Sequence, residues 1–277
     1  MKILENKNKL DILLADFREK KNKIALIPTM GAIHEGHLSL IQKSKKLGFF
    51  SIVTIFVNPT QFNDLDDYIQ YPKDLDTDVK FLEKVGADLL FLPLVKDLYP
   101  DGVKSEKTIL DYRNILCDEF RHGHFDGVTT VVKALFDLVK PDHTFFGEKD
   151  FQQLKLIQKI IEKNKLSIIL HPCISIRMSN GISYSSRYNN FKPYEILFLD
   201  KVAVKIKNSI ERLKKSIDEI FLEDLKEELK IIGINKIDYV EVRNENTLFF
   251  TRKNKNARLF VAFHIGNIRI IDNFILY

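Results

Sequence analysis

Two histidines, His34 and His37, stand three residues apart in the stretch Ile24–Lys46, with Gly36 between them. The stretch opens with a short apolar run and a turn, Pro28–Gly31, and continues with apolar residues at helical spacing. Imidazole nitrogens donate hydrogen bonds to phosphate oxygens, and the positive end of a helix dipole favours the same anion. The pattern therefore predicts a phosphate site where a strand turns into a helix. A pair of ordinary surface histidines at a helix start fits the same spacing, whereas zinc would need a further ligand.

Charged and polar residues farther along the chain suit the same anion. Lys149, in the turn Gly147–Asp150, can balance phosphate charge, and Asp150 can bind a sugar hydroxyl. Gln153 follows one helical turn after Asp150 and faces the same way. The two hydroxyls and the guanidinium of Ser185–Arg187 can hold terminal phosphates. Each of these residues, taken alone, also fits a capping or surface role.

Amides and carboxylates follow the second apolar run. Asn58 and Gln61 can bind a hydroxyl or a carboxylate, or can simply cap the turn in which they lie. Asp74, Asp76 and Asp78 carry the oxygen ligands that Mg²⁺ prefers, but their spacing fits helix N-terminal charge better. Asp76 and Asp78 are therefore weak candidates for metal ligands.

A loop bordered by glycines, Arg121–Gly127, adds a cation and an imidazole. Glycine permits close approach of a ligand, and Arg121 can clamp an anion beside His124. The sequence contains no GxxxxGK[ST] loop, no GxGxxG and no GxSxG, and it shows no nucleophile paired with a base. Donors without a nucleophile suit a reaction in which one bound substrate attacks another, with positioning and charge stabilisation supplying the rate.

Strands and helices alternate over the first two thirds of the chain. Apolar runs predict strands over 24–28, 49–57, 87–93, 144–146 and 167–171. Helical spacing predicts helices over 3–20, 36–47, 74–85, 128–139 and 151–163. This order is typical of an α/β domain with a parallel sheet, in which ligands bind at the carboxyl ends of the strands. The candidate residues lie where such strands end.

The texture of the sequence changes near residue 175. Residues 177–190 are polar and rich in serine and asparagine, and a mostly helical segment then extends to residue 232. Three further strands are expected over 237–242, 259–264 and 268–276. Because no helix separates them, we expect an antiparallel sheet and hence a smaller second domain of α+β type.

Composition limits the class of protein. The chain has 277 residues, 45% of them hydrophobic, and a formal net charge of +5. No apolar run approaches the roughly 20 residues of a membrane span, and the lysines are scattered, so we expect neither a membrane nor a nucleic-acid partner. The N-terminal residues lack the apolar core of a signal peptide, which predicts a cytoplasmic protein. Cys117 and Cys173 lie far apart in sequence and are expected to stay reduced.

Seven segments, in order, resemble the pantothenate synthetase (pantoate–β-alanine ligase) family. They are PTMGAIHEGHLSL (28–40), FVNPTQF (56–62), DYIQYPKDLDTD (67–78), GHFDGVTTVV (123–132), FFGEKDFQQL (145–154), SSR (185–187) and LFVAFHIGNIRIIDN (259–273). The HxGH motif alone would indicate only the broader nucleotidyltransferase superfamily. The resemblance implies a Rossmann-like domain that binds nucleotide and pantoate over 1–176, a C-terminal lid domain over 177–277, and a homodimer.

The resemblance also implies a reaction. ATP, with Mg²⁺, and pantoate would form an enzyme-bound pantoyl adenylate and pyrophosphate, and β-alanine would then attack the acyl carbon to give pantothenate and AMP. The catalytic residues implied, which would meet the α-phosphate oxygens, are His34, His37 and Lys149. The ATP-binding residues implied are Pro28, Thr29, Met30, Gly31, His34, Gly36, His37, Gly147, Lys149, Asp150, Ser185, Ser186 and Arg187. The pantoate-binding residues implied are Met30, Gln61, Phe62, Val131, Val132 and Gln153.

The chain departs from the family pattern in two loops. Asn180 stands where an aspartate is usual, Ser183 and Tyr184 replace a small apolar pair, Tyr188 replaces an asparagine, and His122 replaces a proline. These changes leave the charged residues in place, so they bear on nucleotide binding more than on the reaction. An adenylate must be shielded from water, so we expect the C-terminal domain to close as a lid and carry its serine-rich loop inward.

Two other functions stay open at this point. A nucleotidyltransferase acting on a phosphorylated small molecule would share the histidine motif and the serine-rich loop, but it would not need Gln61 and Gln153 beside an apolar wall. A non-catalytic nucleotide-binding protein would be expected to lose the phosphate-contacting charges, whereas His34, Lys149 and Arg187 are all present.

Overall fold

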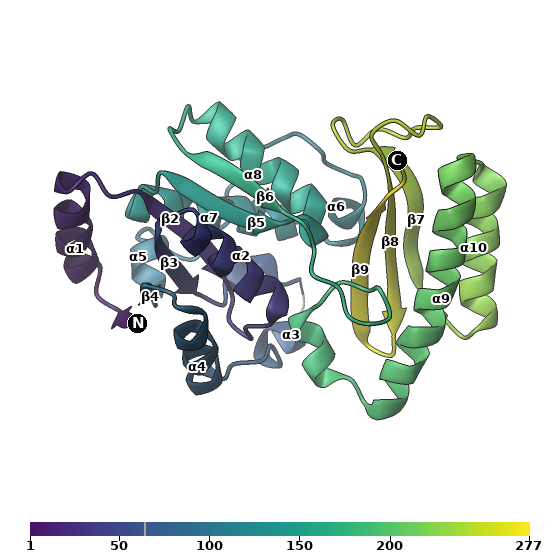
Figure 1. Ribbon diagram of the computed structural model, residues 1–277, viewed down its shortest axis with the longest axis horizontal. Helices are drawn as coiled ribbons and strands as arrows, with labels where there is room; N and C mark the ends of the chain where they lie inside the picture. Colours follow the sequence, from purple (N-terminus) through teal and green to yellow (C-terminus); the bar gives the residue numbers. More distant parts are fainter. Residues whose placement is uncertain (64) are drawn as a thin grey trace. The chain divides into compact units, whose positions relative to one another are not determined.

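The computed structural model describes residues 1–63 and 65–277. They form two compact units, Met1–Ile176 and Arg177–Tyr277, whose helices and strands are labelled in Figure 1. Within the described residues, none of the helices is both long and apolar enough to cross a membrane. Cys117 and Cys173 are both free and buried, in agreement with the prediction that they form no disulfide.

Unit 1 is built on a six-stranded sheet in which every neighbouring pair of strands is parallel. In sheet order, the strands are β1 (Lys2–Leu4), β4 (Leu89–Phe91), β3 (Phe50–Ile55), β2 (Ile24–Thr29), β5 (His143–Gly147) and β6 (Ile169–Cys173). β2 and β3 are buried along most of their length, as expected for nearly continuous apolar runs in a sheet covered on both faces. The predicted parallel α/β fold is confirmed.

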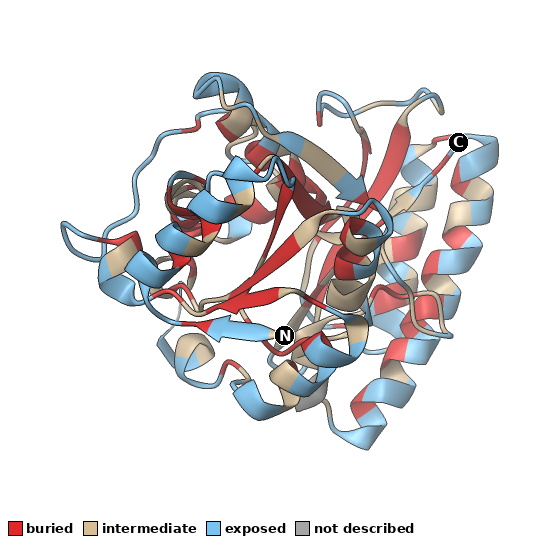
Figure 2. Cartoon of the chain, turned by 60° about the vertical axis from the view of Figure 1, so that its left-hand side comes forward, coloured by how far each residue is buried: buried red, intermediate tan, exposed pale blue. Residues whose placement is uncertain are grey.

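Helices connect and flank these strands (Figure 1). They are α1 (Lys7–Glu19), α2 (Glu35–Lys46), α3 (Leu65–Ile69), α4 (Leu75–Val85), α5 (Val95–Leu98), α6 (Cys117–Phe120), α7 (His124–Val139) and α8 (Phe151–Lys163), with 3-10 turns η1 (Pro59–Gln61) and η2 (Glu148–Asp150). Figure 2 shows buried residues along the strands and on one side of the helices, with exposed residues on the opposite side. One hydrophobic cluster joins Ile27 and Val53 of the sheet to Ile41 of α2 and Leu82 of α4.

β2 is the strand at which the chain changes direction across the sheet. It pairs with β3 on one side and with β5 on the other. Open α/β sheets bind ligands at such switch points, beyond the carboxyl ends of the strands. The segments that follow β2, β3 and β5 carry His34, Gln61 and Lys149. The topology therefore places these three predicted site residues at the same end of the sheet, beyond the carboxyl ends of its strands.

The predicted helix over 3–20 is wrong at its start. Lys2–Leu4 form an edge strand that pairs with β4, and α1 begins at Lys7. Asn6 ends the extended segment, because its side chain accepts a hydrogen bond from Lys9 N at 3.1 Å and caps the helix. The amphipathic pattern does not reveal a strand whose partner lies far along the chain. It also gives no sign of the short helices α3, α5 and α6, and α7 begins at His124, earlier than predicted.

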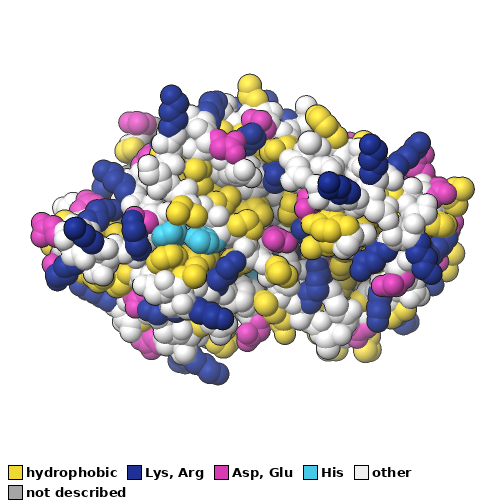
Figure 3. Space-filling model, turned by 45° about the horizontal axis from the view of Figure 1, so that its top comes forward, with side chains coloured by type: hydrophobic (Ala, Val, Ile, Leu, Met, Phe, Trp, Pro, Cys, Tyr) yellow, Lys and Arg dark blue, Asp and Glu magenta, His cyan; other side chains and the backbone are white. Residues whose placement is uncertain are grey.

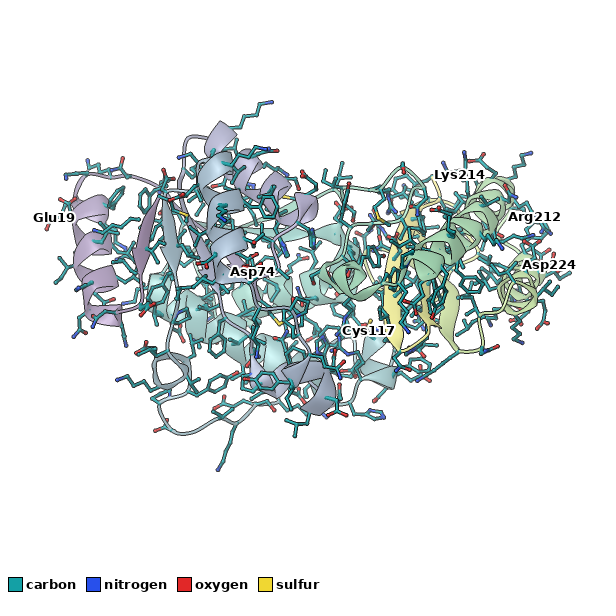
Figure 4. The ribbon with its side chains drawn as sticks, turned by 90° about the horizontal axis from the view of Figure 1, so that it is seen from below. Glu19, Asp74, Cys117, Arg212, Lys214 and Asp224 are labelled. Carbon is teal, nitrogen blue, oxygen red and sulfur yellow. The ribbon has the colours of Figure 1, made fainter. Side chains whose placement is uncertain are left out.

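Unit 2 contains a three-stranded antiparallel sheet and two long helices. Its strands β7 (Ile237–Asn244), β8 (Ala257–Ile265) and β9 (Ile268–Ile275) are neighbours in chain order, as predicted. A 3-10 turn, η3 (Ser186–Asn190), precedes the helices α9 (Pro193–Lys215) and α10 (Glu219–Ile231). The helices are linked by Arg212 Nη2, which donates to Asp224 Oδ2 at 2.7 Å; both residues are labelled in Figure 4. The expected α+β organisation is confirmed.

Candidate functional site

The turn between β2 and α2 brings two histidine rings together. His34 is the N-cap residue of α2, and its Nδ1 accepts a hydrogen bond from Gly36 N at 3.1 Å. The rings of His34 and His37 stack with their centroids 4.1 Å apart. A Cβ on Gly36 would lie 2.7 Å from Cε1 of His34, so only glycine leaves room for that ring. The two imidazoles therefore form one surface at the start of the helix.

Burial keeps both imidazoles neutral near pH 7. Burial, with the neighbouring His37 and Lys149, lowers the pKa of His34 to about 2. Burial and Lys149 lower the pKa of His37 to about 4, although Asp150 opposes this shift. Because Nδ1 of His34 accepts a hydrogen bond, its proton is assigned to Nε2, which is a donor. Nδ1 of His37 is buried and has no hydrogen-bond partner among the described residues.

Lys149 supplies the positive charge of this group. It lies in η2, directly after β5, and its Nζ is 3.8 Å from Oδ2 of Asp150, the N-cap residue of α8. Its charge lowers the pKa of both His34 and His37, which shows that it lies near the two rings. Gly147 ends β5 and begins the turn. Two neighbouring strands thus bring a histidine pair, a lysine and a carboxylate together.

A buried carboxylate fixes the turn before His34. Asp78 accepts a hydrogen bond on each of its oxygens, from Ala32 N at 2.9 Å and from Ile33 N at 2.7 Å. The turn has left-handed backbone at Gly31 (φ 82°) and at Ala32 (φ 49°), a conformation that is unfavourable for alanine. Burial raises the pKa of Asp78, although both backbone N–H groups favour its charged form. Asp78 is therefore a brace for the segment that presents the first histidine.

The hydrogen bonds of Asp78 argue against its role as a metal ligand. Both oxygens of Asp78 are used by the turn, and Asp76 is exposed in the first turn of α4. Asp74 caps the same helix by accepting from Thr77 N at 3.0 Å, and it is labelled in Figure 4. Over residues 1–63 and 65–277, no group of three or more His, Cys, Asp or Glu side chains is placed to hold a metal ion. Asp74 therefore caps α4, and Asp78 holds the turn before α2.

The hydroxyl of Thr29 closes the end of β2. Its Oγ1 donates to Thr54 O at 2.7 Å and accepts from Gly31 N at 3.1 Å. Pro28 and Met30, on either side, are half-buried. The side chain of Thr29 thus links β2 to β3 and to the turn.

Gln61 is held by a network at the end of β3. Its Nε2 donates to Sδ of Met30, and its Oε1 accepts from Asn58 Nδ2 at 3.1 Å. Oδ1 of Asn58 accepts from Tyr99 Oη at 2.5 Å. Asn58 also caps η1 by accepting from Thr60 N at 3.4 Å, which confirms the capping role that its position allowed. The network joins Met30 and Gln61, two residues that the family resemblance assigns to one ligand.

The start of α7 holds the backbone of Gln61. His124 Nδ1 donates to Gln61 O at 2.7 Å, and Arg121 Nη1 donates to His124 Nε2 at 2.9 Å. These partners assign the neutral tautomer with its proton on Nδ1. A Cβ on Gly127 would lie only 2.4 Å from Thr60 O, so glycine lets the helix approach η1 closely. The loop that the sequence indicated as an anion clamp is, in the structure, a support for η1.

Besides Met30, the apolar residues implied to contact pantoate come from two segments, and they are Phe62, Val131 and Val132. The ring of Phe62 lies 5.3 Å from that of Tyr68 and 5.7 Å from that of Tyr71, measured between centroids, in edge-to-face contacts. Val131 and Val132 are buried on α7, the helix whose start supports η1. Phe62 directly follows η1, so these residues belong to neighbouring parts of the fold.

Two adjacent glutamines at the start of α8 have different surroundings. Gln152 is buried, and its amide accepts from Cys117 N at 2.9 Å and donates to Tyr112 O at 2.8 Å; Cys117 is labelled in Figure 4. Gln153, the predicted ligand-binding residue, is half-buried in the first turn of the helix. Gln152 therefore holds the loop before α7, whereas Gln153 stays partly exposed.

The predicted phosphate-binding serines and arginine lie in unit 2. Ser185 is the N-cap residue of η3, and its Oγ accepts from Arg187 N at 3.4 Å. Ser185, Ser186 and Arg187 are all half-buried. Two hydroxyls and a guanidinium are thus carried by three consecutive residues of one capped turn.

Sequence reasoning missed the contacts that hold the site in place, although it had named Asp78 and His124 for other roles. Asp78, Tyr99 and His124 each bind a partner that is distant in sequence. The one available signal is that Asp78 lies one helical turn before the buried Leu82, on the apolar face of its helix. The structure gives no reason for histidine at position 122, where the backbone oxygen accepts from Asn63 Nδ2.

Lys and Arg side chains are spread over the face seen in Figure 3, where they lie among acidic and apolar ones.

Known proteins resemble this chain over its whole length. Residues 2–275 match the family described as Pantoate-beta-alanine ligase. A pantothenate synthetase from Sulfurihydrogenibium sp. (strain YO3AOP1) is 36% identical over 281 residues, which cover 99% of each chain. The crystal structure of pantothenate synthetase from Thermus thermophilus matches with a TM-score of 0.90 at 29% identity and covers 100% of both chains. A pantoate-beta-alanine ligase from Francisella tularensis, complexed with Beta-gamma ATP and Beta-alanine, has a TM-score of 0.85 at 35% identity and covers 100% of this chain and 98% of that one. The protein therefore belongs to the pantoate-beta-alanine ligase family of enzymes.

Proposed function

We propose that the protein uses ATP to join pantoate to β-alanine, forming pantothenate, AMP and pyrophosphate through a pantoyl adenylate. The observation that carries the proposal is the grouping of His34, His37 and Lys149 at the sheet edge where Met30 contacts Gln61. An anion-binding group beside polar and apolar ligands for a small acid suits attack of a carboxylate on a phosphate. Membership of the family, and a relative complexed with Beta-gamma ATP and Beta-alanine, support the same reaction.

In the first step, a carboxylate oxygen of pantoate attacks the α-phosphorus of ATP. A carbon–oxygen–phosphorus linkage forms as the bond from the α-phosphorus to the bridging oxygen breaks, and pyrophosphate leaves. Negative charge grows on the phosphate oxygens, where the N–H donors of His34 and His37 and the ammonium of Lys149 stabilise it. Because burial already keeps both imidazoles neutral, they bind the anion without taking up protons.

The remaining predicted residues position the two substrates. We propose that Gln61 and Gln153 bind the hydroxyls and carboxylate of pantoate, and that the residues packing against its dimethyl group are Met30, Phe62, Val131 and Val132. The groups at the nucleotide are the backbone of Pro28–Gly31 and of Gly36, then Gly147 and Asp150 at the ribose, and Ser185, Ser186 and Arg187 at the β- and γ-phosphates. The network that fixes Gln61 supports this assignment, because a held amide loses little freedom on binding.

In the second step, the amine nitrogen of β-alanine attacks the acyl carbon of the adenylate. The carbon–nitrogen bond forms, the bond from that carbon to the phosphate oxygen breaks, AMP leaves, and the amine loses a proton to solvent. Water would compete for the same carbon, so the reaction needs a shielded site. The lid role of unit 2 stays a prediction, which small-angle scattering with and without an ATP analogue tests; an unchanged profile would contradict it.

Magnesium is the cofactor that the family implies. The described residues offer no cluster of carboxylates to cage it, and both oxygens of Asp78 are already used. A site made by the protein therefore does not fit. We propose that Mg²⁺ arrives with the phosphates of ATP and keeps most of its water ligands, as this ion commonly does.

Turnover with ATP, pantoate and β-alanine, each omitted in turn, tests the proposal. We expect pantothenate and AMP only when all three are present, and exchange of pyrophosphate into ATP that requires pantoate. Exchange with another acid, and none with pantoate, would favour a different nucleotidyltransferase. Binding of ATP without exchange would favour a non-catalytic nucleotide-binding protein. The cytoplasmic location and the homodimer remain predictions, and chromatography coupled to light scattering tests the latter.

A further inference from the structure

A buried carboxylate in unit 2 anchors the segment that leads into Ser185–Arg187. The side chain of Asp272, on β9, is 0% exposed. Its Oδ2 accepts from Arg177 Nη1 at 3.0 Å and from Ser183 N at 2.8 Å. Its Oδ1 accepts from Ser183 Oγ at 2.7 Å. One carboxylate therefore holds both ends of residues 177–183.

Residues 177–183 form a closed turn. Arg177 and Ser183 face each other as an isolated antiparallel bridge, and Gly181 adopts a φ of 92°, which favours glycine. The guanidinium of Arg177 donates to Gly181 O at 2.8 Å and to Asn273 O at 2.7 Å. The turn is thus closed on itself and fixed to β9. The chain is therefore held at Ser183, just before Ser185–Arg187.

A second anchor follows the serine-rich segment. The ring of Tyr188 stacks on that of Phe191 with centroids 5.1 Å apart, and its hydroxyl is buried. Burial, together with the negative charge of Asp272, raises the pKa of Tyr188, which shows that this ring lies near the same carboxylate. Ser185–Arg187 therefore form a short bridge between anchors at Ser183 and Tyr188.

The anchors coincide with departures from the family pattern. An apolar residue at the position of Ser183 would keep the backbone hydrogen bond to Asp272 but would lose the one that the hydroxyl donates. Asn180 Nδ2 donates to Asp200 Oδ1 at 2.8 Å, whereas an aspartate at that position would repel this carboxylate. Asn180 and Ser183 thus each make a side-chain contact that fixes the turn.

We propose that Asp272 is a positioning residue that holds Ser185, Ser186 and Arg187 ready to bind the outer phosphates of ATP. This inference rests on the proposed function, in which those three residues bind the β- and γ-phosphates. A segment that is already ordered loses less conformational freedom when it binds. The effect of Asp272 therefore falls on the affinity for ATP and not on the affinity for pantoate.

The substitution Asp272→Asn tests the proposal. An amide keeps the shape of the side chain, but its NH2 group would face the donors of Ser183 or Arg177, and the guanidinium would lose its counter-charge. We expect the KM for ATP to rise about tenfold or more, from the loss of one or two charged hydrogen bonds. The KM for pantoate stays at the wild-type value, and trypsin cleaves faster after Arg187.

A milder variant, Ser183→Ala, removes only the hydroxyl. We expect it to raise the KM for ATP by about two- to tenfold, the effect of one hydrogen bond. It carries the test if Asp272→Asn does not fold. Unchanged KM for ATP and unchanged cleavage after Arg187 in whichever variant folds would overturn the proposal.

Asp238→Asn is the matched control. Asp238 is a buried acid of β7 in the same sheet, with a side chain 3% exposed, and it pairs with Arg269 Nε at 2.7 Å. Its substitution removes a comparable ion pair without touching the turn, so the KM for ATP should not change. An equal rise in the control would show general destabilisation and overturn the inference. If the wild-type protein makes no pantothenate, the proposed function fails, and the affinity of each variant for a non-hydrolysable ATP analogue still tests Asp272.

Discussion

Gly127→Ala should displace Gln61, which we propose binds pantoate, while leaving the protein folded. Gly127 lies in the first turns of α7, and a Cβ there would be 2.4 Å from Thr60 O, 2.5 Å from Thr60 C and 2.7 Å from Gln61 N. Non-bonded heavy atoms rest at about 3.5 Å or more, so η1 must move away by about 1 Å. These neighbours are backbone atoms, which cannot turn aside as a side chain can. Gln61 would move with them.

The cost to stability is modest because two effects oppose each other. Crowding of this kind costs about 1–3 kcal/mol, whereas alanine is better than glycine inside a helix by about 1 kcal/mol. The net loss is of order 1 kcal/mol, equivalent to about 2–4 °C in Tm. The effect on the reaction is larger, because a shift of about 1 Å in a positioned group costs about a hundredfold in rate.

We therefore expect kcat/KM for pantoate to fall about a hundredfold, with the KM for ATP near its wild-type value. Steady-state turnover at saturating ATP and β-alanine measures the first value, and thermal unfolding checks that the protein is folded. Lys133→Ala is the control, because Lys133 lies on the same helix and pairs with Asp137 at the surface. Activity of Gly127→Ala within threefold of the wild type would refute the account of how α7 supports Gln61.

Three further predictions concern the histidine turn. His34→Ala should lower kcat about a hundredfold or more, the effect of removing one donor to the transition state, and turnover close to wild type would revive the non-catalytic alternative. Asp78→Asn leaves one of two backbone N–H groups facing an amide NH2. We expect a loss of about 1–3 kcal/mol in the free energy of unfolding, measured by urea titration. We also expect kcat to fall, whereas Asp76→Asn should leave kcat unchanged. Because burial lowers the pKa of His37 from 6.5 to about 4, the unfolded state binds more protons between these values, so Tm should fall as the pH drops through that range. His37→Gln should flatten this part of the curve, and an unaltered pH dependence would contradict the assigned burial.

Periodicity and composition sufficed to predict the main elements of this fold. The strands at 24–28 and 49–57 are nearly continuous apolar runs, and a chain can bury such runs only inside a sheet covered on both faces. The helices at 74–85 and 151–163 carry their own boundary signals, such as Asp74 and Gly86 at the two ends of α4. These are local properties, so the sequence contains them directly. The short strand β1 was hidden because its partner, β4, lies far along the chain.

The sequence also indicated which chemical groups we propose for the site. Histidines around a glycine, a lysine after a strand and amides after another are choices of residue type, and their order along the chain resembles one family. The contacts that hold these groups come from the tertiary structure. Asp78 holds the turn before His34, and His124 of α7 binds the backbone of η1. Both depend on contacts between segments that no local pattern connects. A buried hydrogen bond needs a partner at a particular distance and angle, and only the folded chain supplies that geometry.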